Sequence, residues 1–178
     1  MKNHVTDKDE EDRRLKALAE YRILGTEPES CYDDITQIAA RTCHVPISLM
    51  TLVDKDRQWF KSKVGFQTSE TRRDWSFCTH AIKENNPLIV NDAYQDKRFI
   101  NNPLVTGDPK IRFYAGFPLK NNDGNKLGTL CVIDRKPGSL DEEQCSIMEL
   151  LAKQIVSFLE LRKRSLNLLD ALSHLHNQ

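Results

Sequence analysis

The spacing of apolar residues along the chain predicts two helices before any strand. Apolar positions recur at helical spacing over residues 14–23, and Gly25 followed by Pro28 is expected to end this first helix. A second helix is predicted over about residues 29–43, where the apolar positions again follow a three-and-four spacing. Pro46 closes that segment, because proline cannot continue a helix.

The pattern then changes to short runs of β-favouring residues, which predict antiparallel strands. These runs are Ile47–Val53, Gln58–Val64, Leu88–Val90, Phe113–Leu119 and Leu127–Asp134. The last two flank an Asp-Gly step at residues 123–124, which is a strong hairpin signal. Two long irregular stretches, Phe66–Ile82 and Ala93–Arg112, interrupt the strands. Loops of this length usually serve a function, so we expect them to cover or line a site.

A third helical pattern follows Pro137 and Gly138 and runs nearly to the end of the chain. Ser139 and Glu142 match a capping box at its start. The predicted helix has about 35 residues and a length of about 50 Å, which is too long to lie only on a domain of this size. A heptad seam passes through Leu151, Gln154, Phe158, Leu161, Ser165, Leu168, Leu172 and Leu175. Two of these positions are polar, so the seam predicts a weak coiled coil.

This order of elements predicts an α+β fold, with helices packed on one face of an antiparallel sheet. The chain of 178 residues is long enough for one domain. Residues 1–14 are almost entirely polar, and we expect them to form a disordered tail.

Composition excludes several classes of protein. The chain has 26 Lys and Arg and 26 Asp and Glu, so its net charge is zero. A dedicated nucleic-acid-binding domain usually carries a basic excess, and we expect no nucleic-acid partner. No apolar run approaches the roughly 20 residues that cross a bilayer, and residues 1–14 contain no signal-peptide core. We therefore expect a cytoplasmic protein without membrane contact.

The cysteines give no sign of a disulfide framework or a metal site. The five residues are Cys31, Cys43, Cys78, Cys131 and Cys145, and no pair has CxxC spacing. Reduced thiols are the interpretation that fits such a set, and burial as small apolar side chains is the default for most of them.

A series of sequence blocks, taken together, resembles the GAF domain family of bacterial signalling proteins. The blocks are Asp54–Ser62, Ser76–Ile82, Val90–Ala93, Asp96–Phe99, Asn102–Val105, Arg112–Leu119 and Leu127–Asp134. The resemblance covers about residues 15–164 and leaves 165–178 as an extension of the last helix. It implies a central antiparallel sheet of five or six strands, terminal helices on one face and pocket-covering loops on the other.

The same resemblance implies a role in signal transduction. Such domains bind small molecules upstream of histidine kinases, diguanylate cyclases or phosphodiesterases, in two-component and cyclic di-GMP signalling. The implied partners are an unidentified ligand, a second copy joined through the terminal helices, and a downstream kinase or cyclase. A ligand-free dimerisation module is the alternative. A cysteine-dependent methionine sulfoxide reductase or redox sensor is a more distant one, because the five cysteines are not clustered in sequence.

The candidate ligand pocket comes from the two irregular stretches and the strand that follows them. Its expected residues are Trp75, Phe77, Cys78, His80, Phe99, Arg112 and Tyr114. Arg112 and the neighbouring aromatic residues could bind an anionic ligand by ion pairing and stacking. Equally, Arg112 could form a salt bridge with Asp92 or Asp108 and simply fix the loop. No residue is assigned a catalytic role.

The Cys78-Thr79-His80 segment allows several kinds of chemistry. On an extended strand, Cys78 and His80 would face the same side and could form a nucleophile pair, a metal pair or a chromophore anchor. Bilin-binding relatives carry Cys and His consecutively, whereas Thr79 intervenes here, so a covalent bilin is not expected. The favoured interpretation is structural, with Cys78 buried and His80 hydrogen-bonded. The cofactor, if there is one, is left open.

Overall fold

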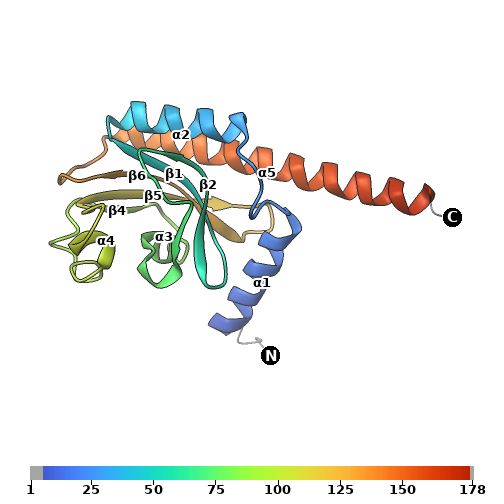
Figure 1. The fold of residues 1–178 in the computed structure, drawn as a ribbon, viewed down its shortest axis with the longest axis horizontal. Helices are drawn as coiled ribbons and strands as arrows, with labels where there is room; N and C mark the ends of the chain where they lie inside the picture. Colours follow the sequence, from blue (N-terminus) through green and yellow to red (C-terminus); the bar gives the residue numbers. More distant parts are fainter. Residues whose placement is uncertain (1–5, 177–178) are drawn as a thin grey trace.

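A six-stranded antiparallel sheet forms the centre of the computed structural model, which describes residues 6–176 (Figure 1). The strands lie in the order β3-β2-β1-β6-β5-β4, and every neighbouring pair is antiparallel. Their bounds are β1 Ile47–Val53, β2 Arg57–Val64, β3 Glu70–Arg72, β4 Leu88–Val90, β5 Phe113–Lys120 and β6 Lys126–Asp134. The predicted α+β fold is confirmed. The short strand β3 lies inside a stretch for which the sequence predicted no strand.

Two helices, α2 (Ser30–Cys43) and α5 (Glu142–His176), run along one face of the sheet (Figure 1). Their apolar stripes pack against alternate residues of β1, β5 and β6 and form the first of two hydrophobic cores. Buried members of this core include Ile35 and Ala39 from α2 and Ile155 from α5. Among the described residues, no helix combines the length and the apolar character that crossing a membrane requires.

Short helices and loops cover the opposite face of the sheet. They include the 3-10 helix η1 (Arg73–Trp75), α3 (Phe77–Ala81) and α4 (Pro103–Thr106). Figure 1 shows α3 and α4 on the side of the sheet away from α2 and α5. A second hydrophobic core fills the space between these segments and the sheet. The two faces therefore carry different layers, helices on one and loops on the other.

The first helix begins and ends earlier than the sequence predicts. Helix α1 spans Asp7–Glu20, so the expected disordered tail is wrong for residues 7–14, while residues 1–5 lie outside the described part. The Asp9 N–H donates to the Thr6 hydroxyl (3.2 Å) and the Thr6 N–H donates to the Asp9 carboxylate (3.0 Å), which completes a capping box. The acidic first turn also suits the helix dipole, so a charged segment forms a helix here.

Helix α5 is continuous to His176, as predicted, but its cap differs. Asp141 and Gln144 exchange hydrogen bonds at 2.7 and 3.0 Å, so the capping box lies two residues beyond the expected Ser139 and Glu142. The heptad seam is also divided. Leu151 and Phe158 pack against the core of the domain, whereas the later leucines are exposed on the part of α5 that extends beyond the sheet (Figure 1).

A bulge in β2 sets the connection between α1 and α2. The β1–β2 register shifts between Met50, opposite Ser62, and Thr51, opposite Phe60, so that Lys61 has no opposite residue. Its ammonium group is fully buried and donates to the Glu29 carboxylate at 2.6 Å.

The same buried ammonium binds the loop before α2 at two further oxygens. Lys61 donates to the Glu27 carbonyl at 2.6 Å and to the Thr26 hydroxyl at 2.8 Å. From α5, Arg162 donates to the same Glu29 oxygen at 3.3 Å and to the Tyr21 carbonyl at 2.9 Å. Glu29 thus joins β2 to α5.

Replacing Lys61 with Ala should lower the free energy of unfolding by about 3 kcal/mol, because three hydrogen bonds from a buried ammonium and the packing of its side chain are lost. Urea denaturation followed by circular dichroism measures this change. Lys63→Ala is the matched control from the same strand. Its side chain is exposed, so the expected loss is below about 0.5 kcal/mol, and equal losses in the two variants would contradict the assigned role of Lys61.

Candidate functional site

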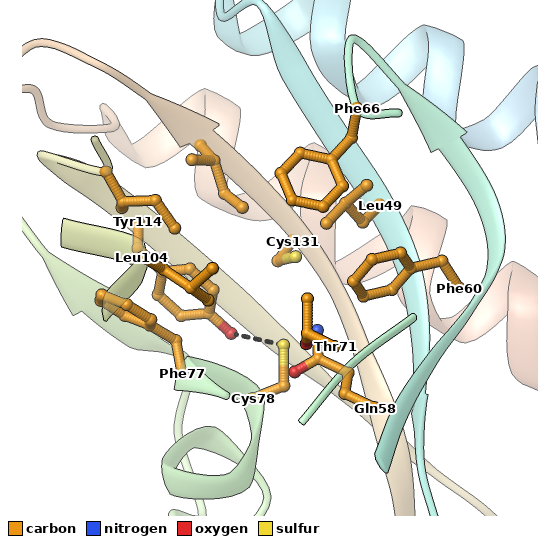
Figure 2. Close-up of a pocket in the computed structure, with 12 residues that line it drawn as sticks. Leu49, Gln58, Phe60, Phe66, Thr71, Phe77, Cys78, Leu104, Tyr114 and Cys131 are labelled. Atoms are coloured by element: carbon orange, nitrogen blue, oxygen red, sulfur yellow. Dashed lines mark hydrogen bonds between the residues drawn. The ribbon is translucent and has the colours of Figure 1, made fainter. Parts of the chain in front are cut away.

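A small cavity of about 20 Å³ lies between the sheet and the loops that cover it. Figure 2 shows the side chains that line it. They are Leu49, Gln58, Phe60, Phe66, Thr71, Phe77, Cys78, Leu104, Ile111, Tyr114, Cys131 and Ile133. The volume has room for about one water molecule. Its wall is mainly apolar, with a few hydroxyl, amide and thiol groups.

The strands and α3 together position the polar part of this wall. Side chains alternate along a strand, so Tyr114 on β5 and Cys131 on β6 face the cavity while their neighbours face the helices. At the start of α3, the Ser76 hydroxyl accepts from the Thr79 N–H at 3.1 Å and donates to the Gln58 side chain. This cap fixes α3 against β2 and directs Cys78 inward.

The helical conformation of residues 77–81 separates Cys78 from His80. Residues two apart in a helix lie about 200° apart, whereas the sequence analysis assumed an extended strand with both on one side. Cys78 is buried, but His80 is exposed and contacts the edge of Phe99, with ring centroids 4.9 Å apart. Partial burial lowers the pKa of His80. The alternative that pairs Cys78 with His80 is therefore wrong, and the burial of Cys78 agrees with the favoured structural interpretation. Within residues 6–176, the His80 side chain contacts Phe99 and forms none of the expected hydrogen bonds.

Hydroxyl groups surround the Cys78 sulfur instead. The Tyr114 hydroxyl donates to Cys78 Sγ at 3.2 Å, as Figure 2 shows, and the Thr129 hydroxyl donates at 3.0 Å. Thr129 also contacts the Thr51 hydroxyl at 3.2 Å. Gly116, two residues after Tyr114 on the same strand, leaves room for the tyrosine, since a Cβ at that position would collide with the Tyr114 hydroxyl.

These contacts determine how the thiol ionises. Burial by itself raises the pKa of Cys78, but hydrogen bonds from the thiol of Cys131 and from the hydroxyls of Thr129, Thr51 and Tyr114 outweigh burial and lower it to about 6. Burial and the neighbouring Cys78 raise the pKa of Cys131 and that of Tyr114 well above their ordinary values. Of the two thiols, Cys78 therefore has the lower pKa and ionises first.

The other expected site residues lie around the cavity without lining it. Phe99 stacks beneath Phe77, with ring centroids 4.0 Å apart and an interplanar angle of 9°. Arg112 donates to both carboxylate oxygens of Asp92 at 2.7 and 2.8 Å, which fixes the loop before β5. Trp75 lies at an outer groove. Of the seven candidates, Phe77, Cys78 and Tyr114 border the cavity itself.

That outer groove has a volume of about 460 Å³ and lies next to the cavity. Phe66, Thr71 and Leu104 line both spaces, so these three side chains separate the cavity from the groove. All three are half-buried. The Thr71 hydroxyl is inaccessible and has no hydrogen-bond partner among residues 6–176. The three residues therefore form a thin part of the wall between the cavity and the groove.

The family model described as GAF domain matches residues 27–158. The chain belongs to the GAF domain family. A cyclic di-GMP phosphodiesterase of Pseudomonas aeruginosa is 36% identical over 171 residues, which make up 96% of this chain and 29% of the relative. The GAF domain described here thus spans less than a third of the length of that curated relative.

Solved structures show the same fold. The free methionine-R-sulfoxide reductase of Neisseria meningitidis, solved with its substrate, has a TM-score of 0.62 at 15% identity, with 91% of this chain and 97% of that chain covered. The GAF domain of an Acinetobacter phosphoenolpyruvate-protein phosphotransferase has a TM-score of 0.61 at 15% identity, covering 89% and 97%. At this identity the likeness concerns the fold alone.

Several cavity residues of the GAF domain were not identified from the sequence. Leu49, Cys131 and Ile133 lie on predicted strands, and the two-residue alternation could have placed them on the face of Tyr114 once the strand order was known. Phe66 and Leu104 come from separate loops, and no local pattern pairs them. Within residues 6–176, no group of three or more His, Cys, Asp or Glu side chains is arranged to hold a metal ion.

The low pKa of Cys78 is measurable by following thiolate absorbance in the ultraviolet against pH. The reduced domain should show one thiolate that forms at about pH 6, because the thiolate predominates above the pKa. Tyr114→Phe should move this transition upward, since one donor to the thiolate is lost. Cys31→Ser should leave it unchanged. A transition that persists in Cys78→Ser would contradict the assignment.

Proposed function

We propose that this GAF domain is the sensory module of a signalling protein. A small molecule binds between the sheet and the covering loops, and binding alters the position of α5. The observation that supports this most directly is the shared wall formed by the sheet. Tyr114 and Cys131 face the cavity, while their neighbours Ala115 and Val132 face the core of α2 and α5. A shift of β5 or β6 would therefore change the packing both around the cavity and beneath α2 and α5.

Strand β2 supplies a second connection from the cavity to α5. Gln58 and Phe60 line the cavity, and the next residue, Lys61, binds Glu29 on the helix side. Glu29 in turn accepts from Arg162 of α5. A ligand that displaces Phe60 therefore acts on an ion pair that holds α5. Such a coupling requires the ligand to prefer one of two arrangements of this network.

The output of the module is proposed from its relative. The similarity to the cyclic di-GMP phosphodiesterase of Pseudomonas aeruginosa extends over 29% of that protein. We propose that the domain regulates a partner enzyme of cyclic di-GMP turnover, or a kinase of a two-component system, rather than catalysing a reaction of its own. The bound molecule itself belongs to an unidentified class, and the small volume of the cavity implies that the covering loops move to admit it.

Homodimerisation through α5 is the proposed route to that output. Leu161, Leu168, Leu172 and Leu175 are 54 to 72% exposed and follow a heptad spacing on the part of the helix beyond the sheet. Apolar residues with this period match the same face of a second copy, because a parallel pair buries both stripes. Change in the cavity would then alter the packing of the two helices.

A thermal-shift experiment tests the pocket. A ligand from a panel of nucleotides, haem, bilin and amino acids, present at one hundred times its dissociation constant, should raise the melting temperature by about 5 to 10 °C. Leu104→Trp should abolish the shift by filling the entrance. Ile100→Trp, at an exposed position of the same loop, should retain it. If no compound acts on the wild type, the ligand-free dimerisation module becomes the better account.

Light scattering at micromolar concentration tests the dimer. Replacing both Leu168 and Leu172 with Asp should convert a dimeric mass to a monomeric one, because it puts four like charges into the paired stripe. Leu150→Asp is the control, since this leucine is 60% exposed on the same helix but lies outside the seam. An unchanged mass in the double variant would overturn the helix interface.

A further inference from the structure

Two cysteines border one cavity, and the proposed ligand binding does not use them. Cys78 comes from α3 and Cys131 from β6, 53 positions apart in the sequence, and both are almost completely buried. Figure 2 places both side chains among the residues that line the cavity. The remaining three cysteines lie on α2 or α5, away from it. A pair of buried thiols beside one small cavity calls for an explanation.

We propose that Cys78 and Cys131 form a peroxide-reactive dithiol. Cys78 is the nucleophile that attacks hydrogen peroxide, and Cys131 is the resolving thiol that closes a disulfide with it. The geometry that supports this assignment is the set of groups around Cys78 Sγ. Two hydroxyls donate to it at 3.0 and 3.2 Å, the cavity lies against it, and the second thiol borders the same cavity.

The reaction balances with the peroxide as the sole oxidant. The Cys78 thiolate attacks one peroxide oxygen, so that an S–O bond forms and the O–O bond breaks. The leaving hydroxide takes a proton from the Tyr114 hydroxyl, which lies within hydrogen-bonding distance of Sγ, and departs as water. Two electrons pass from sulfur to the peroxide, and Cys78 becomes a sulfenic acid.

In the second step, Cys131 loses its proton and forms the disulfide with Cys78. Its thiol returns a proton to the Tyr114 phenolate, and its sulfur attacks Cys78 Sγ. An S–S bond forms, the S–O bond breaks, and the hydroxide leaves as water with one proton from the solvent. Overall, one thiolate, one thiol, one hydrogen peroxide and one proton from the solvent give one disulfide and two waters.

The dimensions of the cavity select the oxidant. About 20 Å³ admits a molecule little larger than water, so hydrogen peroxide fits with a small expansion, whereas an organic hydroperoxide enters only after the covering loops have moved. Entry leads from the outer groove past the half-buried Phe66, Thr71 and Leu104. The unpartnered hydroxyl of Thr71 offers the entering peroxide a hydrogen-bond partner midway. A buried thiol is thereby open to one small reagent and protected from larger ones.

Any signalling effect of this oxidation rests on the proposed sensory function, whereas the chemistry does not. A disulfide would tie α3 to β6, whose other face carries the core beneath α2 and α5. The reaction itself needs only the two cysteines, Tyr114 and hydrogen peroxide, so oxidation can occur in the isolated domain even if no ligand binds. Conversely, ligand binding is measurable in reduced protein and in Cys78→Ser, so that failure of one hypothesis does not decide the other.

The experiment treats the full chain with hydrogen peroxide and maps its cysteines by mass spectrometry against time. Cys78 and Cys131 should join in a disulfide before Cys31 or Cys145 reacts, although these two are more exposed. In Cys131→Ser, dimedone should trap a sulfenic acid on Cys78. tert-Butyl hydroperoxide should react at least about tenfold more slowly. Oxidation of Cys31 and Cys145 ahead of Cys78 would overturn the proposal.

Two further variants separate reactivity from folding. Tyr114→Phe should slow the reaction by about tenfold or more, because the proton donor is lost. Gly116→Ala should act similarly by displacing the same hydroxyl, and far-ultraviolet circular dichroism reports whether each variant is folded. Because the reactivity order is measured on the wild type, a variant that fails to fold leaves the test intact. Unchanged rates in a folded Tyr114→Phe would exclude the tyrosine as proton donor and overturn the mechanism.

Discussion

The buried ammonium of Lys61 is the constraint on which the arrangement of this domain depends. A buried ammonium group needs hydrogen-bond acceptors. Lys61 lies at the β2 bulge and reaches the loop before α2, where the Glu29 carboxylate and two neutral oxygens accept its hydrogen bonds. Glu29 then holds Arg162, which binds the α1–α2 connection as well. One strand irregularity therefore fixes a loop, the start of α2 and the position of α5.

Because the sheet is one layer thick, the cavity and the long helix cannot be treated as separate features. Phe60 and Lys61 are consecutive, yet one lines the cavity and the other serves the helix face. The same alternation on β5 places Tyr114 over the thiol and Ala115 under the helices. The two faces differ in what covers them. Regular helices of 14 and 35 residues cover one face, and short helices and loops cover the other. The loop face is the one that can open.

The sequence predicts what depends on local periodicity. Five strands, α2 and the length of α5 follow from apolar spacing, and the GAF fold follows from the sequence blocks. Helix α1 was missed at its start because capping by Thr6 and Asp9 outweighs the polar composition. At the site, Phe77, Cys78 and Tyr114 were foreseen, but His80 was misplaced because a five-residue helix and a strand cannot be distinguished by so short a pattern. Phe66 and Leu104 meet only through tertiary packing, which one sequence does not encode locally.

The hydrogen bonds around Cys78 connect the two proposals physically. A thiolate inside an apolar wall is costly, and the hydrogen bonds that Tyr114 and Thr129 donate to Cys78 Sγ offset this cost. A ligand that accepts a hydrogen bond from the Tyr114 hydroxyl would remove this donor from Cys78 and would make the thiolate less stable. By linkage, ionisation of Cys78 opposes the binding of that ligand by the same free energy. A disulfide removes the charge altogether and releases the tyrosine. In the two proposals, the ligand and the Cys78 thiolate therefore compete for one hydrogen-bond donor, the Tyr114 hydroxyl. The redox state of the two cysteines would then affect which ligands the domain binds.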